Sequence, residues 1–356
     1  MPLTGPGFAV RNRDLSTGDG AQDGRWLAVD ESGWDGEQLH DRQRRYLTVA
    51  IVAVDDEVAS GMVSDMRDAV GQRQAPELKF RHLRTMKGAA AFLDLFGAGG
   101  ALADRCLAHA VDKEYSAVAK IIDLLVEEQD YDQGDGDLLF SGKARQMART
   151  FYNDGPRALR DGHFDRLVDA FVRLASSRGR DDPQAAADRL FDEIERAWPH
   201  CHRKPVTEIL MRLRTTRRFA DEIHSDDPSV LPALEMLVPS LVQLIRWTHP
   251  LGAVSVLVDE QRVFTDDVLE LLEDKLRNPD PISRRLRQPR IDLRALVRGS
   301  SAAHPSVQLA DLVAGAAGSV MNTVRGQDPV VDALRPCVLG LLDENSIMPN
   351  GFGAFA

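Results

Sequence analysis

The sequence predicts an α/β fold that is interrupted by a large, all-helical insertion. Apolar runs rich in aliphatic and β-branched residues indicate strands, and segments of helical periodicity alternate with them. The strand candidates are residues 25–33, 46–54, 106–111, 253–258 and a weaker run at 291–297. From about residue 130 to residue 248 only helical patterns occur, and this change of character predicts the insertion.

The first third of the chain supplies three of these strands. Residues 1–24 are rich in Gly, Asp and Thr, and we expect a loose tail there. The first apolar run climbs to Asp30 and breaks at a Ser-Gly turn, after which we expect a polar, hairpin-like segment. Residues 46–54 predict a central strand because the run is β-branched and apolar throughout. Asp55 and Asp56 follow at the N-cap position of a helix.

Helical spacing of apolar residues predicts the remaining elements. A short extended segment is expected at residues 76–80. Helices are expected at residues 88–96, 116–128, 144–151, 165–175, 183–197, 206–219, 231–247, 265–277, 306–324 and 329–342. We therefore divide the chain into a tail (1–24), a first half of the sheet domain (25–129), the helical insertion (130–250) and a second half of the sheet domain (251–356).

Composition narrows the class of protein. No apolar stretch approaches the ~20 residues that span a bilayer, and we expect no contact with a membrane. Cys106, Cys201 and Cys337 are too few and too scattered for a disulfide framework or a cysteine-based zinc site. The N-terminus lacks a basic-then-apolar signal sequence. These features together predict a cytoplasmic location.

Charge is unevenly distributed along the chain. The formal net charge of −11 argues against a protein that coats nucleic acid nonspecifically. Two stretches are nevertheless rich in arginine: residues 202–218, and residues 283–298, which include Arg294 and Arg298. Arginine suits bidentate contact with phosphate. Two interpretations stay open: the arginines contact nucleic acid, or they are solvated and pair with acidic residues elsewhere.

Three aspartates occupy positions that packing does not explain. Asp30 and Asp259 each end an apolar strand, and Asp311 lies in an otherwise apolar helix. Gln308, Asp311 and Gly315 share one helix face by their spacing. Carboxylates that converge repel one another unless a divalent cation neutralises them, and an all-oxygen cluster favours Mg²⁺ or Mn²⁺ over zinc. The alternative is that the strand-end aspartates form turns or caps and that Asp311 pairs with an arginine.

Several short motifs occur in the order found in a known family. They are Val-Asp-Glu-Ser-Gly at 29–33, Glu-Leu-Lys at 77–79, Val-Asp-Lys at 111–113, Leu-Val-Asp at 257–259 and Gln-Leu-Ala-Asp-Leu-Val-Ala-Gly at 308–315. With these motifs the chain resembles the bacterial domain of unknown function 3800 (DUF3800) family, over residues 25–113 and 253–320 but not over the insertion. One departure is that residues 298–301 offer serines but lack the lysine of a Ser-Lys pair that members tend to carry.

The resemblance implies a ribonuclease-H-like mixed sheet with helices on both sides and a site at the strand ends. Carried over by position, it implies metal binding by Asp30, Glu77, Asp259 and Asp311. It also assigns Lys79 and Lys113 to phosphate or to the cluster, and Ser32 and Gln308 to substrate or to a ligand carboxylate. His304 precedes the last motif, where related enzymes place a mobile histidine that protonates the leaving group; the alternative is an exposed loop histidine.

We therefore expect a nuclease that hydrolyses phosphodiester bonds of DNA or RNA with two Mg²⁺ or Mn²⁺ ions, with a role in defence against foreign nucleic acid. The competing hypothesis is a catalytically inactive protein of the same fold that binds a partner through its helical region. A third is a metal-dependent phosphatase acting on small nucleotides. A homodimer or a defence-system partner protein is compatible with each. The sequence leaves the choice between DNA and RNA open.

Overall fold

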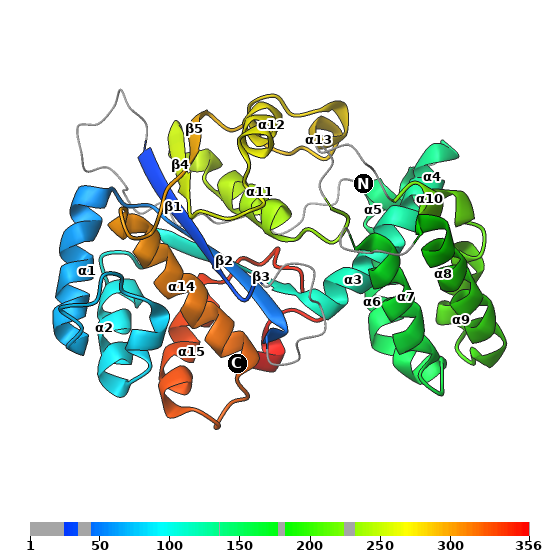
Figure 1. Cartoon of the computed structure of the whole chain (residues 1–356), viewed down its shortest axis with the longest axis horizontal. Coiled ribbons are helices and arrows are strands. Elements are labelled where there is room, and N and C mark those ends of the chain that lie inside the picture. The colour runs from blue at the N-terminus through cyan, green and yellow to red at the C-terminus, as the bar shows by residue number, and fades with distance from the viewer. Residues whose placement is uncertain (1–24, 35–43, 135, 177–181, 224–231, 356) are drawn as a thin grey trace, which may run out of the picture.

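The chain forms a five-stranded sheet with helices on both faces and a helical lobe to one side (Figure 1). The computed structural model describes residues 25–34, 44–134, 136–176, 182–223 and 232–355. The expected tail, and most of the expected hairpin-like segment, lie outside the described residues. Within them no helix is long and apolar enough to cross a membrane.

The sheet is mixed, and its strands lie in the order β3-β2-β1-β4-β5. The strands are β1 (Arg25–Ser32), β2 (Tyr46–Val52), β3 (Cys106–Asp112), β4 (Val254–Val258) and β5 (Leu293–Arg298). The first three pair antiparallel, whereas β4 pairs parallel with both β1 and β5. The α/β prediction is confirmed, and each strand lies within two residues of its expected limits at either end.

Helix α14 (Pro305–Asn322) lies across β1 and β2 on one face of the sheet (Figure 1). Small side chains let the helix backbone come close. The hydroxyl of Thr48 donates to the carbonyl oxygen of Ala314 at 2.8 Å. A Cβ added at Gly318 would lie 3.2 Å from Thr48 Oγ1, and one at Gly315 would lie 2.5 Å from Phe80 Cβ. Glycine is therefore required where α14 meets the 80s segment.

Three further helices complete the layer around α14 (Figure 1). They are α1 (Asp56–Val70), α2 (Met86–Phe96) and α15 (Pro329–Leu341). The segment expected to be extended at 76–80 bends at residues 76 and 77, is extended at Lys79 and then enters a short 3₁₀ helix, Phe80–Leu83. At the start of α1, Asp55 is the N-cap residue but its side chain makes no cap bond. The next carboxylate, Asp56, bonds Ser306 of α14 instead, so α1 is tied to α14 at this end.

Most of the remaining helices lie between β3 and β4 in the sequence. After β3 come α3 (Lys113–Ile121), a π-helical segment (Ile122–Glu127), α4 (Glu128–Asp132), α5 (Asp137–Ser141), α6 (Lys143–Ala158), α7 (His163–Ala175), α8 (Pro183–Ala197), α9 (Lys204–Leu213), α10 (Arg217–Asp221) and α11 (Leu237–Trp247). One continuous apolar core joins the sheet to these helices. The segment expected as one helix over 206–219 breaks near Thr216, whose buried hydroxyl donates to the carbonyl of Leu213.

Helix α11 belongs with the sheet by its packing. The sequence prediction places it in the insertion, but it packs against β2 and β3, whereas α4 to α10 form the lobe seen to the right in Figure 1. After β4, α12 (Asp266–Arg277) begins at its N-cap Thr265, whose hydroxyl accepts from the Val268 amide. The short α13 (Pro281–Arg285) then leads to β5 at the edge of the sheet.

Candidate active site

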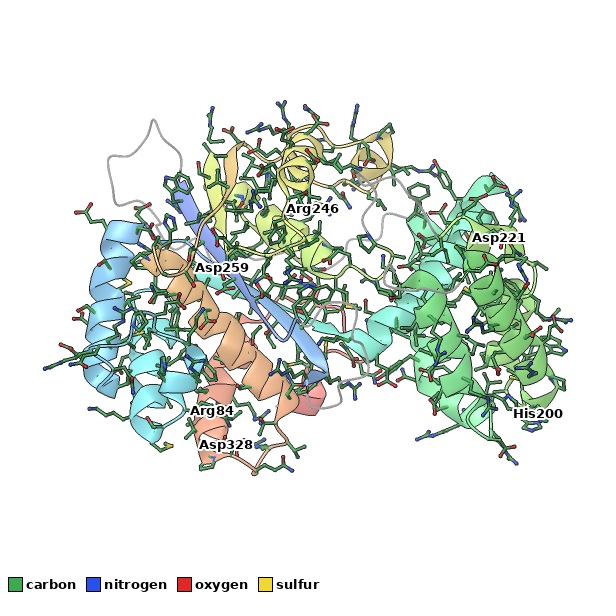
Figure 2. The ribbon with its side chains drawn as sticks, in the orientation of Figure 1. Arg84, His200, Asp221, Arg246, Asp259 and Asp328 are labelled. Atoms are coloured by element: carbon green, nitrogen blue, oxygen red, sulfur yellow. The ribbon has the colours of Figure 1, made fainter. Side chains whose placement is uncertain are left out.

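Asp30 and Asp259 lie level with each other at the ends of two neighbouring parallel strands. Val29 pairs with Val258, and the Asp259 amide donates to the Val29 carbonyl at 3.0 Å. Figure 2 shows Asp259 at the end of β4, near the first half of α14. Asp30 is only 4% exposed, and its Oδ1 accepts from the Glu31 amide at 2.7 Å. Its other oxygen, Oδ2, is buried and has no hydrogen-bond partner among the described residues.

Asp311 reaches the same region from α14. Its Oδ2 accepts from the backbone amide of Phe80 at 3.1 Å, and its Oδ1 lies 3.8 Å from Lys79 Nζ. The close contact between Phe80 and Gly315, one turn further along α14, holds this segment against the helix. The helix therefore presents its carboxylate to the sheet while the 77–80 segment supplies a donor and a cation.

Glu77 and Lys79 both belong to that segment. Lys79 Nζ lies 3.3 Å from Glu77 Oε2 and 3.4 Å from the hydroxyl of Ser301. Ser301 in turn donates its backbone amide to Asp259 Oδ1 at 3.1 Å. Four predicted residues, Asp30, Glu77, Asp259 and Asp311, are thus brought into one electrostatically connected group with Lys79.

Gln308 holds the two loops of the site together. Its Oε1 accepts from the Leu78 amide at 3.0 Å and from Arg67 at 3.1 Å, and its Nε2 donates to the Ser301 carbonyl at 2.7 Å. The side chain is buried and both ends of the amide are used. Gln308 therefore positions the segments that carry Lys79 and Ser301.

Burial and mutual repulsion change the acidity of the cluster. Burial raises the pKa of Asp30 well above its usual range, and the charges of Glu31, Asp259 and Asp311 raise it further. Burial also raises the pKa of Asp259 against the hydrogen bonds from Glu260 and Ser301, and that of Asp311 against the charge of Lys79. Burial alone would lower the pKa of Lys79, but Asp311, Asp30 and Glu77 together raise it. The carboxylates thus exceed the positive charge provided for them.

Glu31 is a member of this group that the sequence reasoning missed. Burial raises its pKa to about 7, with a smaller contribution from the charge of Asp259. Its Oε1 accepts from Gln261 Nε2 at 2.8 Å. Strand alternation assigns residue 31 to the face opposite Asp30. At the end of a strand, however, a long side chain can turn around the edge, and the adjacent Asp-Glu pair was the available signal.

Two predicted residues lie away from the cluster. Asp30 is level with Ala50 and through it with Ala108, whereas Lys113 follows Asp112, four positions further along β3. Asp112 thus lies about 13 Å further along the sheet than Asp30, and its strand, β3, is two strands away from β1. The structure therefore does not bring Lys113 to the carboxylates. Ser32 lies on the same sheet face as Asp30, but it faces a later part of α14. A Cβ added at Gly318, seven residues after Asp311, would lie 3.4 Å from the hydroxyl oxygen of Ser32.

Three other predicted residues are engaged with acids outside the cluster. His304 Nδ1 lies 2.6 Å from Asp56 Oδ2. Burial would raise the pKa of Asp56, but hydrogen bonds from Ser306 and His304 lower it. The last two are Arg294, which pairs with Asp292 at 3.3 Å, and Arg298, which pairs with Asp266 at the start of α12.

The donor set suits a hard divalent cation, although it is not arranged as a finished coordination shell. Within the described residues no three His, Cys, Asp or Glu side chains form a ready metal-binding group. The buried, unbonded Oδ2 of Asp30 is the observation that favours a cation, since an unpaired buried carboxylate is costly. Carboxylate oxygens are the ligands that Mg²⁺ and Mn²⁺ prefer.

The chain matches no family model, no curated protein and no solved structure. The resemblance to the DUF3800 family stays a prediction. Any assignment of function therefore depends on the geometry and charge of the carboxylate site.

Proposed function

We propose that the chain is a metal-dependent nuclease that hydrolyses phosphodiester bonds at the strand-end carboxylates. The single observation that carries the proposal is the buried, unbonded oxygen of Asp30 beside Asp259 and Asp311. Burial first, and then the charges of Glu31, Asp259 and Asp311, raise the pKa of this carboxyl. Such a group is stable in its charged form when a divalent cation compensates it.

Asp30, Asp259 and Asp311 would hold the ion or ions, with Glu77 at the rim. Bound Mg²⁺ or Mn²⁺ would supply a water of lowered pKa and stabilise the departing oxygen. Lys79, held between Glu77 and Asp311, places an ammonium where it can contact a phosphate oxygen. Gln308 and Ser301 keep the Lys79 segment and Asp259 in fixed relation.

The strand pairing of the sheet supports the proposed ribonuclease-H-like classification. Three antiparallel strands are followed by two parallel ones, and both strand-end aspartates lie at the edge where β1 and β4 end. The pairing of β1 with both an early and a late strand explains how residues 30 and 259 meet.

A polyanionic substrate is supported by the region between α13 and the start of β5, at the end of the parallel strands opposite to Asp259. A cleft of about 410 Å³ there is lined by three arginines, Arg277, Arg290 and Arg294. Arg290 makes no ion pair within the described part of the chain. An arginine-lined cleft next to the parallel strands favours nucleic acid over an uncharged substrate.

Cleavage of labelled single-stranded DNA and RNA with Mn²⁺ tests the proposal. An Asp30→Asn/Asp259→Asn variant should lose at least about 100-fold in rate, because changes even to groups behind metal ligands cost 10–100-fold. Asp65→Asn, on the exposed side of α1, is the matched control and should retain the wild-type rate. Equal cleavage by wild type and the double variant would overturn the proposal. Turnover of mononucleotides without cleavage of polymers would favour a phosphatase instead.

A further inference from the structure

A second cleft, of about 390 Å³, opens on the same sheet face as the carboxylates. Its floor includes Trp26 of β1, Leu257 of β4 and Val297 of β5. Trp26 lies on the face of Asp30 by strand alternation, and Leu257 pairs with Val297 in the sheet. Trp26 is 38% exposed and Val297 is 39% exposed. The floor thus combines one aromatic and two aliphatic side chains.

The start of α14 explains why this floor is uncovered. The first turn of the helix covers Ala28 and Leu257 through Val307, and these three side chains form a small apolar cluster. Trp26 precedes Ala28 by two residues on β1 and is left beyond the covered part. An exposed tryptophan beside an apolar floor is a surface that a ligand can cover.

The polar walls of the cleft are already neutralised. Arg298 pairs with Asp266, and His304 pairs with Asp56. Each cationic side chain in the wall therefore has its own carboxylate. The cleft does not offer the excess positive charge that a phosphate needs, and a flat, uncharged group with polar edges fits it better.

The cleft is also close to the proposed site of hydrolysis. Leu257 precedes Asp259 by two residues on β4, about 7 Å along the same face, and Trp26 precedes Asp30 by four residues on β1, about 13 Å along that face. His304 is packed against Gly299, in the loop whose Ser301 amide bonds Asp259. A group bound on Trp26 can thus belong to the same ligand as a phosphate at the carboxylates.

We propose that this cleft binds one nucleobase of a single-stranded nucleic acid, stacked on Trp26, next to the phosphodiester that is cleaved. The inference rests on the proposed function and adds the substrate class to it. A base within a duplex must first be unstacked and unpaired, at a cost of a few kcal/mol, before it can lie on a protein side chain, whereas a base of a single strand is free to do so. The substrate is therefore an unpaired strand.

Tryptophan fluorescence tests this inference without catalysis. A short oligothymidylate is titrated into the full chain in EDTA, and a hairpin duplex of similar length is titrated in parallel. The single strand should quench the emission and the duplex should not. Trp26→Phe should abolish the quenching, and Trp26→Ala should weaken binding roughly tenfold. Trp198→Phe, in the helical lobe, is the matched control and should quench as the wild type does.

Several outcomes would overturn the inference. They are quenching that persists in Trp26→Phe, equal binding of the duplex, and unchanged affinity of Trp26→Ala. Acrylamide quenching of the free protein gives a further test: no difference between wild type and Trp26→Phe would show that Trp26 is already covered. Binding through Trp26 without any cleavage in Mn²⁺ would support the base site and overturn the nuclease proposal. Cleavage in Mn²⁺ together with single-strand binding that does not change in the Trp26 variants would support the nuclease proposal and overturn the base site.

Discussion

Charged side chains are paired differently in the helical lobe and in the part of the sheet around β4 and β5. In the lobe, arginines of the stretch 202–218 meet acids from neighbouring helices. Arg203 lies 2.8 Å from Asp154, and Arg214 lies 2.6 Å from Glu195. Further pairs of this kind are Arg217 with Asp188 and Arg218 with Asp132. These charges largely cancel one another.

Around β4 and β5, charges of each sign are left over, with the carboxylates at the C-terminal end of β4 and the arginines before the start of β5. Within the stretch 283–298, Arg284 donates to the carbonyl of Pro279 and Arg285 lies 3.7 Å over the ring of Phe140. Arg287 and Arg290 make no ion pair among the described residues. Of the carboxylates of the site, Glu77 and Asp311 share the ammonium of Lys79.

The difference separates charges that are paired between helices from charges that are left without an equal opposite charge. Exposed ion pairs contribute little stability, but they remove the field that would attract a polyanion. We therefore expect nucleic acid to lie over the edge of the sheet, and not over the lobe. The two arginine-rich stretches look alike in sequence, and only the placement of acids on neighbouring helices distinguishes them.

The largest stability effect expected is from the cation. At 100 times its Kd, Mn²⁺ should raise the free energy of unfolding by about 2.7 kcal/mol, seen as a rise of a few degrees in Tm. Asp30→Asn/Asp259→Asn should lose this rise. Asp188→Asn, which breaks a lobe ion pair, should keep it. An equal rise in all three proteins would show that the ion binds elsewhere and would remove the contrast between the two regions.

The strands and most helices were predictable because their signals are local. Residues 46–52 read as a strand from composition alone, and Asp311 shares a helix face with Gln308 by spacing. The partners of Gln308, Leu78 and Ser301, were not predictable, since they lie on loops whose paths depend on packing against α14. Contacts between distant segments produce no periodic pattern of apolar residues in the sequence from which they could be predicted.

Lys113 is a residue that the sequence wrongly assigned to the site, again because its position depends on long-range pairing. Its motif follows the first two in the order that the resemblance requires, yet the antiparallel pairing of β2 and β3 carries it past the level of Asp30. Register is a property of strand pairing, and a short motif does not report it. Glu31 was missed for a related reason, because the alternation of side chains between the two sheet faces does not fix the position of a long side chain at the end of a strand.

Neutralising the unpaired arginines should weaken binding of single-stranded nucleic acid. For Arg287→Gln/Arg290→Gln we expect roughly tenfold lower affinity at low salt, and a slope of log K against log salt that is smaller by about 1.4. The matched control is Arg214→Gln/Arg217→Gln, which removes two arginines that are already paired and should change the affinity less than about twofold. Anisotropy titrations in EDTA at several salt concentrations measure both. A larger loss in the control would place the binding surface on the lobe.

The smallest effect expected concerns the pH dependence of stability. Burial first, and then the charge of Asp259, raise the pKa of Glu31 to about 7 in the folded chain. An unfolded glutamate titrates near its ordinary pKa of about 4.3. Between these values the folded state binds more protons than the unfolded state, so this group lowers stability as the pH rises, and its full cost is present above pH 7.

Glu31→Gln should remove that cost while its side-chain oxygen still accepts from Gln261. We expect the free energy of unfolding at pH 8 to rise by on the order of 1 kcal/mol, and to change little at pH 4. Urea unfolding at the two pH values measures the difference, with Glu195→Gln in the lobe as control, which should stay within about 0.5 kcal/mol of wild type. If Glu31→Gln destabilised the chain equally at both pH values, Glu31 would be a structural partner like the lobe acids, and not part of the uncompensated cluster.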